Sequence, residues 1–143
     1  MIPYFKQSAD WTCGPACMRM VLASLGIKKS EKALARLLHS NKRIGTKNYE
    51  FPALCEKLRL SYIVRRNGSV GEIKEFLPWC KVIVCYWLPD EKTGHYAVVK
   101  KIDSRKIYLI DPWLGKNHSL SIAYFRKHWY GKEDKRWFIA IKL

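Results

Sequence analysis

One cysteine of this sequence stands where a thiol could act as a nucleophile. Cys13 comes at the start of a predicted helix, and Gly14 and Pro15 follow it. The N-terminal end of a helix favours negative charge, and the thiolate is the reactive form of cysteine. Proline suits the first helical turn, and glycine lets the backbone approach a ligand closely. The sequence therefore predicts that Cys13 is a catalytic nucleophile.

A histidine and an aspartate in the second half of the chain could serve that thiol. His95 stands at the start of a predicted strand, 96–102, and Asp111 ends the next one, 106–110. A histidine can take and return the proton of a thiol, and a carboxylate can hold the histidine in the required orientation. We therefore expect His95 to be the general base and Asp111 its partner.

The distance between these two side chains depends on how the two strands pair. A loop of three residues would pair Ile102 with Lys106. Ala97 would then lie opposite Asp111, and His95 would be the diagonal neighbour of Asp111 on the same face. Diagonal neighbours are about 7–8 Å apart, which is close enough for the two side chains to meet. A slip of one residue would place them on opposite faces.

Four further residues are candidates for contacts with a substrate. Gln7 lies six residues before Cys13. Its amide could donate a hydrogen bond to a developing oxyanion, together with the backbone N–H of the cysteine. Trp11 and Trp113 flank the candidate catalytic residues in the sequence, and Gly94 precedes the histidine. We expect these three to line a substrate cleft.

The first half of the chain is predicted to be helical. Apolar residues recur at helical spacing over 14–25, and Gly26 follows where a C-cap is expected. Ser30 is a typical N-cap for a second helix. A third helix is expected to begin near Thr46 or Asn48.

The second half is predicted to be mainly an antiparallel sheet. A capping box at Ser69–Glu72 predicts a short helix that runs to about Leu77, and one more helix is expected within 119–130. Segments rich in Val, Ile and aromatic residues predict strands at 61–64, 82–87, 96–102, 106–110 and 137–141. Helices first and strands later indicate an α+β fold, and we expect one domain over residues 1–143.

The charge of the chain makes an anionic partner a possibility. Lys and Arg total 27 against 12 Asp and Glu, for a formal net charge of +15. The basic residues are spread along the chain, and no recognised nucleic-acid module accompanies them. An anion-binding protein is therefore an alternative, and not the main interpretation.

The cysteines and the apolar runs indicate the compartment. Five cysteines, with no C-x-x-C pair among them, argue against a disulfide framework and against a four-ligand zinc site. The longest apolar run, 82–88, is far shorter than the roughly 20 residues of a transmembrane helix. The first residues lack the pattern of a secretory signal. We expect a cytoplasmic protein without a membrane span, a metal or a cofactor.

The candidate residues stand in segments that resemble the C39 peptidases and C39-like domains. The matching segments are Gln7, Thr12–Cys17, Met20–Leu22 with Gly26, Gly45–Thr46, Gly94–Val99, and Asp111–Pro112 with Gly115. The resemblance implies a papain-like cysteine peptidase fold, in which N-terminal helices, with the nucleophile at a helix N-terminus, pack on a C-terminal antiparallel sheet. It also implies a peptide or protein substrate.

By this resemblance, Cys13 is the nucleophile, His95 the general base, Asp111 the residue that fixes the histidine tautomer, and Gln7 an oxyanion donor. Leader peptidases of the family usually carry an acidic residue where this chain has Thr12. The chain is more similar to the standalone C39-like domains. Two alternatives stay open: a non-catalytic peptide-binding module, and an acyl transferase that uses the same thioester. The oligomeric state is open as well.

Overall fold

The computed structural model describes residues 1–143. Its five helices are α1 (Cys13–Ser24), α2 (Glu31–Leu37), α3 (Glu50–Lys57), α4 (Val70–Phe76) and α5 (Ile122–His128). Its six strands are β1 (Ser61–Arg65), β2 (Lys81–Leu88), β3 (Thr93–Ile102), β4 (Lys106–Asp111), β5 (Gly115–Ser121) and β6 (Phe138–Lys142). None of the helices has the length and apolar character needed to cross a bilayer.

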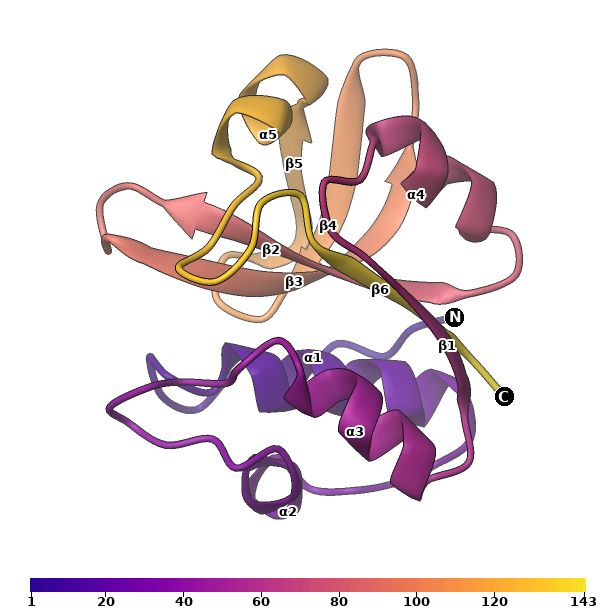
Figure 1. Cartoon of the computed structure of the whole chain (residues 1–143), viewed down its shortest axis with the longest axis vertical. Coiled ribbons are helices and arrows are strands. Elements are labelled where there is room, and N and C mark those ends of the chain that lie inside the picture. The colour runs from indigo at the N-terminus through magenta and orange to yellow at the C-terminus, as the bar shows by residue number, and fades with distance from the viewer.

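The strands form one antiparallel sheet in the order β1-β6-β2-β3-β4-β5. Helices α1, α2 and α3 lie on one face of the sheet, and α4 and α5 lie on the other (Figure 1). The predicted α+β arrangement is confirmed: helices from the first half of the chain pack on a sheet built mainly from the second half.

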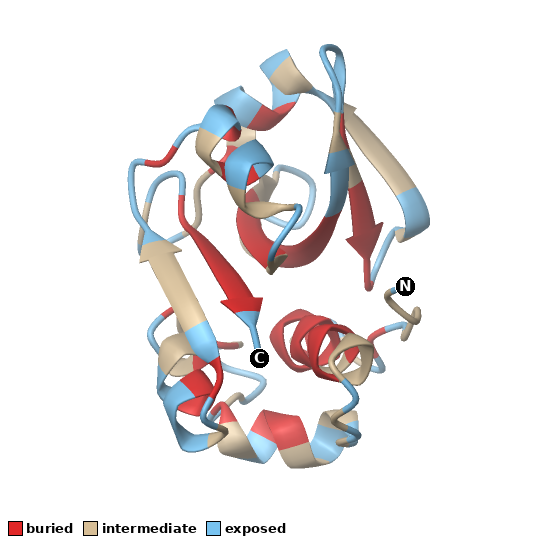
Figure 2. Cartoon of the chain, turned by 90° about the vertical axis from the view of Figure 1, so that its right-hand side faces the viewer, coloured by how far each residue is buried: buried red, intermediate tan, exposed pale blue.

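Each face of the sheet has its own hydrophobic core. In β2, Ile83 and Cys85 belong to the core beneath α1, α2 and α3, whereas Val82 and Val84 belong to the core beneath α4 and α5. A strand that is covered on both faces is expected to be apolar at successive positions, as β2 is. Figure 2 shows that α1 is buried along most of its length, because it lies between the sheet and the other N-terminal helices.

Several predicted helix ends are confirmed. The Ser30 side chain accepts a hydrogen bond from the backbone of Ala33, and Ser69 and Glu72 form the predicted capping box. Gly26 follows α1 with a φ of +84°, which glycine adopts without strain. These local signals fix the ends of α1 and the starts of α2 and α4.

The third helix begins later than predicted. Helix α3 starts at Glu50, because the side chains of Thr46 and Asn48 bind tertiary partners and do not cap a helix. The hydroxyl of Thr46 bonds to that of Ser40 at 2.7 Å, and the amide oxygen of Asn48 accepts from the hydroxyl of Tyr96. Both residues therefore tie the loop before α3 to its neighbours.

Strand β5 was not predicted. Its sequence is mostly polar, and it lies at the edge of the sheet, where only one side of the strand is hydrogen-bonded. An edge strand with few buried residues lacks the apolar pattern that marks a strand in a sequence. The expected helix within 119–130 is present as α5, but it is limited to Ile122–His128.

Candidate active site

Cys13 is the first residue of α1, with 9% of its surface exposed. The residue after it, Gly14, packs against the loop before α3: a Cβ there would lie 2.5 Å from the Thr46 hydroxyl oxygen. The sequence pattern suggested that this glycine makes room for a ligand. In the structure, the close approach is to Thr46, so Gly14 sets how tightly the start of α1 packs on that loop.

The register between β3 and β4 differs from the prediction at one end and agrees with it at the other. Ile102 pairs with Ile107, and not with Lys106 as predicted. A shift between Val99 and Lys101 then changes the register by one residue, so that Val98 lies opposite Ile110. This irregularity restores the predicted alignment near the site. A β-bulge of this kind re-aims the side chains beyond it.

The shift brings His95 and Asp111 together. The Nε2 atom of His95 lies 2.7 Å from Oδ1 of Asp111, and the two residues are 4% and 0% exposed. Burial of the ring lowers the pKa of His95, but hydrogen bonds to Asp111 and Cys13 outweigh this effect and raise it to about 10. Because Nε2 faces the carboxylate, Nδ1 is the nitrogen left for the thiol. The pair therefore favours a protonated ring beside Cys13.

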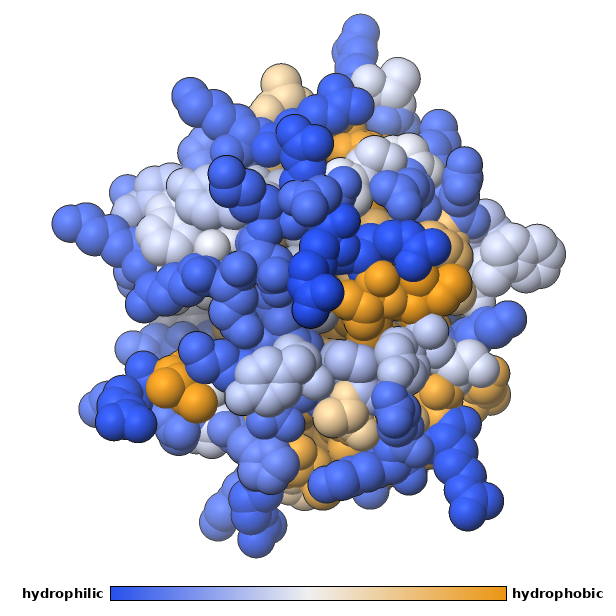
Figure 3. Space-filling model, in the orientation of Figure 1, coloured by the Kyte–Doolittle hydropathy of each residue, from blue (hydrophilic) through white to orange (hydrophobic).

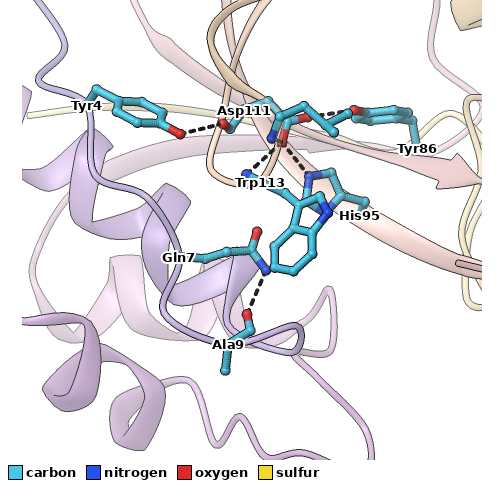
Figure 4. A network of polar contacts seen from close by, with 8 residues as sticks. Tyr4, Gln7, Ala9, Tyr86, His95, Asp111 and Trp113 are labelled. Atoms are coloured by element: carbon cyan, nitrogen blue, oxygen red, sulfur yellow. Dashed lines mark hydrogen bonds and ion pairs between the residues drawn. The ribbon is translucent and has the colours of Figure 1, made fainter.

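The carboxylate of Asp111 accepts four hydrogen bonds (Figure 4). Oδ1 accepts from His95 and, at 2.9 Å each, from the backbone N–H groups of Trp113 and Leu114; Oδ2 accepts from the Tyr86 hydroxyl at 2.5 Å. Burial alone would raise the pKa of Asp111, but these hydrogen bonds and the charge of His95 lower it. Asp111 is thus held ionised and in one orientation.

Gln7 lies beside this network and is 5% exposed. Its backbone N–H donates to the carbonyl of Pro112 at 2.9 Å, and its side-chain nitrogen donates to the carbonyl of Ala9 at 2.7 Å (Figure 4). The side-chain oxygen has no partner within the protein. The amide nitrogen carries two hydrogens, so one remains for another acceptor. The backbone bond also connects the N-terminal segment to the turn that follows Asp111.

A cavity of about 290 Å³ brings the predicted site residues together. Its lining includes Gln7, Trp11, Cys13, Gly94, His95 and Trp113. Asp111 is the one predicted site residue outside this lining, because it lies behind His95 and is fully buried. The thiol, the imidazole and the Gln7 amide are therefore open to one space, and the carboxylate is closed off from it.

Sequence reasoning missed Tyr86. This residue lies directly opposite His95 in the pairing of β2 with β3, and the two rings meet edge to face with centroids 5.6 Å apart. Its hydroxyl donates to Asp111. Tyr86 therefore contacts both members of the buried pair. The antiparallel pairing of β2 with β3 is the signal that predicts this contact, because it sets Tyr86 opposite His95.

Sequence reasoning also missed the role of Asn48. Its amide oxygen accepts from the hydroxyl of Tyr96, the residue after His95, and its amide nitrogen donates to Asp134 at 2.9 Å. Its backbone N–H donates to Glu133 at 3.0 Å. These bonds connect the loop before α3 to the sheet beside the cavity. No local signal marks Asn48, because its partners are 48 to 86 residues away.

The other cysteines have different surroundings. Cys17 is fully buried in the core between α1 and the sheet, and burial raises the pKa of its thiol well above the usual value. Cys85 lines the cavity, yet it is 6% exposed and burial likewise raises its pKa. Neither thiol has a histidine–carboxylate pair of its own among its hydrogen bonds. Cys80 is partly exposed and lies outside the cavity.

Two solved structures share this fold over nearly the whole chain. One is the peptidase domain of Streptococcus ComA, a bifunctional ABC transporter of a quorum-sensing pathway. It superposes with a TM-score of 0.77 at 22% identity, and the match covers 99% of this chain and 97% of that domain. A double-glycine motif protease from an AMS/PCAT transporter, solved with its leader peptide, gives a TM-score of 0.78 at 18% identity, covering 99% and 91%. The chain therefore has the fold of these peptidase domains.

Sequence comparison identifies the family. An uncharacterised protein of Methanothermobacter marburgensis is 32% identical over 111 residues, which cover 78% of this chain and 72% of that protein. The family model described as the Peptidase C39 family matches residues 1–133. This match includes Gln7, Cys13, His95 and Asp111. The chain belongs to the Peptidase C39 family.

Proposed function

We propose that this protein is a cysteine peptidase that hydrolyses a peptide bond of a peptide or protein substrate, with Cys13 as its nucleophile. The observation that carries the proposal is the buried pair of His95 and Asp111 beside Cys13, at the edge of an open cavity. A structurally similar protease binds a leader peptide, which supports a peptide as the ligand.

The first half of the reaction forms a thioester. The Cys13 thiol gives its proton to Nδ1 of His95, which leaves a thiolate beside the protonated ring, and the sulfur then attacks the carbonyl carbon of the scissile bond. His95 then returns that proton to the leaving amine, so the C–N bond breaks as the C–S bond persists. Asp111 holds the ring through Nε2 and stabilises its protonated form.

Two N–H donors are available for the negative oxygen of the intermediate. The Cys13 backbone N–H lies in the first turn of α1, where N–H groups have no acceptor within the helix. The second hydrogen of the Gln7 amide nitrogen is the other donor, because the first is held by Ala9. Removing one donor of this kind typically costs a factor of about 100 to 1000 in kcat.

Water completes the reaction by attacking the thioester. His95, neutral again after the first step, takes a proton from this water and gives it to the leaving thiolate. The acyl group leaves as a carboxylic acid, and Cys13 is regenerated. Attack by an amine in place of water would instead transfer the acyl group, which is the transferase alternative.

Alkylation of the native protein tests the proposal. We expect iodoacetamide and the peptidase inactivator E-64 to add once, quickly, and at Cys13, as measured by intact mass. Cys13→Ser should abolish the addition and His95→Ala should slow it, because the base is lost. Cys80→Ser is the matched control, since Cys80 is more exposed than the other free cysteines, and it should change nothing.

A slow alkylation of Cys13 that His95→Ala leaves unchanged would contradict the proposal. It would mean that the fold is present without an activated thiol, and it would favour a peptide-binding module that does not cleave its ligand.

A further inference from the structure

One wall of the cavity carries positive charge only. Lys42, Arg43 and Lys47 line the cavity from the loop between α2 and α3, and we call these three residues the basic wall. This loop projects from the helical half on the same side as the β2–β3 hairpin projects from the sheet (Figure 1). A chain that lies in the cavity beside Cys13 must therefore pass close to the basic wall.

The backbone of the loop is held in a fixed turn. Asn41 and Gly45 exchange two backbone hydrogen bonds, at 3.2 and 2.8 Å. The side chain of Asn41 also accepts from the backbone of Arg43 and Ile44. The two basic residues in this turn are thus presented by an ordered backbone, which reduces the entropy lost when they bind a ligand.

No acidic residue of the chain pairs with the basic wall. The four salt bridges of the protein lie elsewhere. Three carboxylates also line the cavity, Asp10, Glu91 and Glu133, but none is bonded to the wall, and Glu133 accepts from the backbone of Asn48. The positive charges of the wall are therefore available to a ligand.

We propose, on the basis of the proposed function, that the basic wall is a subsite for an acidic side chain of the peptide substrate. A carboxylate beside Cys13 can bond to Lys42, Arg43 or Lys47 without displacing an existing partner. Figure 3 shows that the face viewed here is mainly hydrophilic, with hydrophobic residues in separate groups. The substrate class is thus a peptide with Asp or Glu near the scissile bond.

The same cavity does not suit a nucleic acid. A phosphodiester chain carries a negative charge at every residue, so it would also meet Asp10, Glu91 and Glu133 at close range. Like charges at such distances repel. A peptide with one or two acidic residues avoids this repulsion, because its other side chains can be neutral or basic.

Peptide selection from a library tests the subsite. The Cys13→Ala protein, which cannot form a thioester, is immobilised and mixed with a library of random decapeptides, and the bound peptides are sequenced by mass spectrometry. We expect Asp and Glu to be enriched about fivefold over Asn and Gln, the effect of a few partly exposed ion pairs. The cleft variant, Lys42→Gln/Arg43→Gln/Lys47→Gln in the same protein, should lose this enrichment.

The control removes the same amount of charge from another place. Lys100, Lys101 and Lys116 line a separate depression over β3 and β5, and replacing all three with Gln gives the outer variant. The outer variant should keep the preference, since its cavity is unchanged. Three results would overturn the subsite. The enrichment of Asp and Glu could be absent from the Cys13→Ala protein, it could survive in the cleft variant, or it could be lost equally in both variants.

The two proposals fail in different ways. Slow alkylation of Cys13 with an intact preference for acidic peptides would overturn the peptidase and keep the subsite. Fast alkylation without that preference would overturn the subsite and keep the peptidase.

Discussion

The two ends of the site are bonded very differently. At the Asp111 end, both carboxylate oxygens have donors, and the residue is fully buried. At the Gln7 end, the amide oxygen has no partner in the protein and only one bond is made by the nitrogen. His95 lies between the two ends, bonded to Asp111 on one side and facing the cavity on the other.

This difference separates a structural task from a chemical one. A buried carboxylate destabilises the folded state unless its hydrogen bonds are complete. The donors around Asp111 must therefore be held in fixed positions. A hydrogen-bonding group that is left incomplete beside a cavity can bond to something that enters it. The Asp111 end should therefore govern stability, and the Gln7 end should govern reactivity.

The largest effect is expected at the Asp111 end. Asp111→Ala would leave the Tyr86 hydroxyl, the His95 ring and two backbone N–H groups without their acceptor, and we expect a loss of about 3–5 kcal/mol in the free energy of unfolding. Asp111→Asn keeps one oxygen for the backbone donors and should lose less than half as much. Urea denaturation at neutral pH measures both. Equal losses of unfolding free energy in the two variants would show that the charge of Asp111 stabilises the fold and that its hydrogen bonds to the backbone do not.

A smaller effect, on reactivity alone, is expected at the Gln7 end. With a peptide that the wild type hydrolyses, Gln7→Ala should lower kcat about 100-fold, because an oxyanion donor is lost. The free energy of unfolding should fall by less than about 1 kcal/mol, since the carbonyl of Ala9 keeps two donors from Thr12.

Alkylation by iodoacetamide, which forms no oxyanion, separates the two possible roles of Gln7. The rate of alkylation of Cys13 should be the same in the wild type and in Gln7→Ala. An equal slowing of alkylation and peptide hydrolysis would instead show that Gln7 positions Cys13.

The smallest effect is the change in stability over one pH unit. His95 has a native pKa of about 10 against an ordinary value of 6.5, so the folded state holds a proton that the unfolded state has released between these values. The stabilisation is therefore complete below about pH 6.5, declines by about 1.4 kcal/mol per pH unit above it, and is lost near pH 10.

Urea denaturation at several pH values measures this decline in Cys13→Ser, where no thiol supplies the proton of the ring, with Cys13→Ser/His95→Gln as the reference. The difference in unfolding free energy between these two variants isolates the histidine, paired with Asp111, from the other groups that titrate in this range. A difference that does not change between about pH 6.5 and 8.5 would contradict the raised pKa.

Local sequence patterns predict much of the fold. Ser30, Ser69 with Glu72, and Gly26 mark helix ends because each satisfies backbone groups within a few residues of itself. The strands β2, β3, β4 and β6 were identified by runs of Val, Ile and aromatic residues, since these strands are buried in the sheet. Strand β5 lies at the edge, has no such run, and could not be found in this way.

The sequence by itself determined which residues are brought together. Gln7 and Cys13 flank the start of a helix, while His95 and Asp111 stand at the ends of neighbouring strands, and these positions follow from residue type and short-range spacing. The family resemblance rests on the same residues. Such signals suffice for Cys13, His95 and Asp111 because each of them is placed by its own helix or strand.

Tertiary structure alone decided how these residues are held. The register shift near Lys100 aligns His95 with Asp111 although the hairpin itself pairs differently from the prediction. Tyr86 completes the bonds of the carboxylate, and Asn48 ties the loop before α3 to strand β3 through the Tyr96 hydroxyl. These features depend on contacts between residues far apart in the chain, whose geometry is fixed only when the sheet twists and both of its cores are packed.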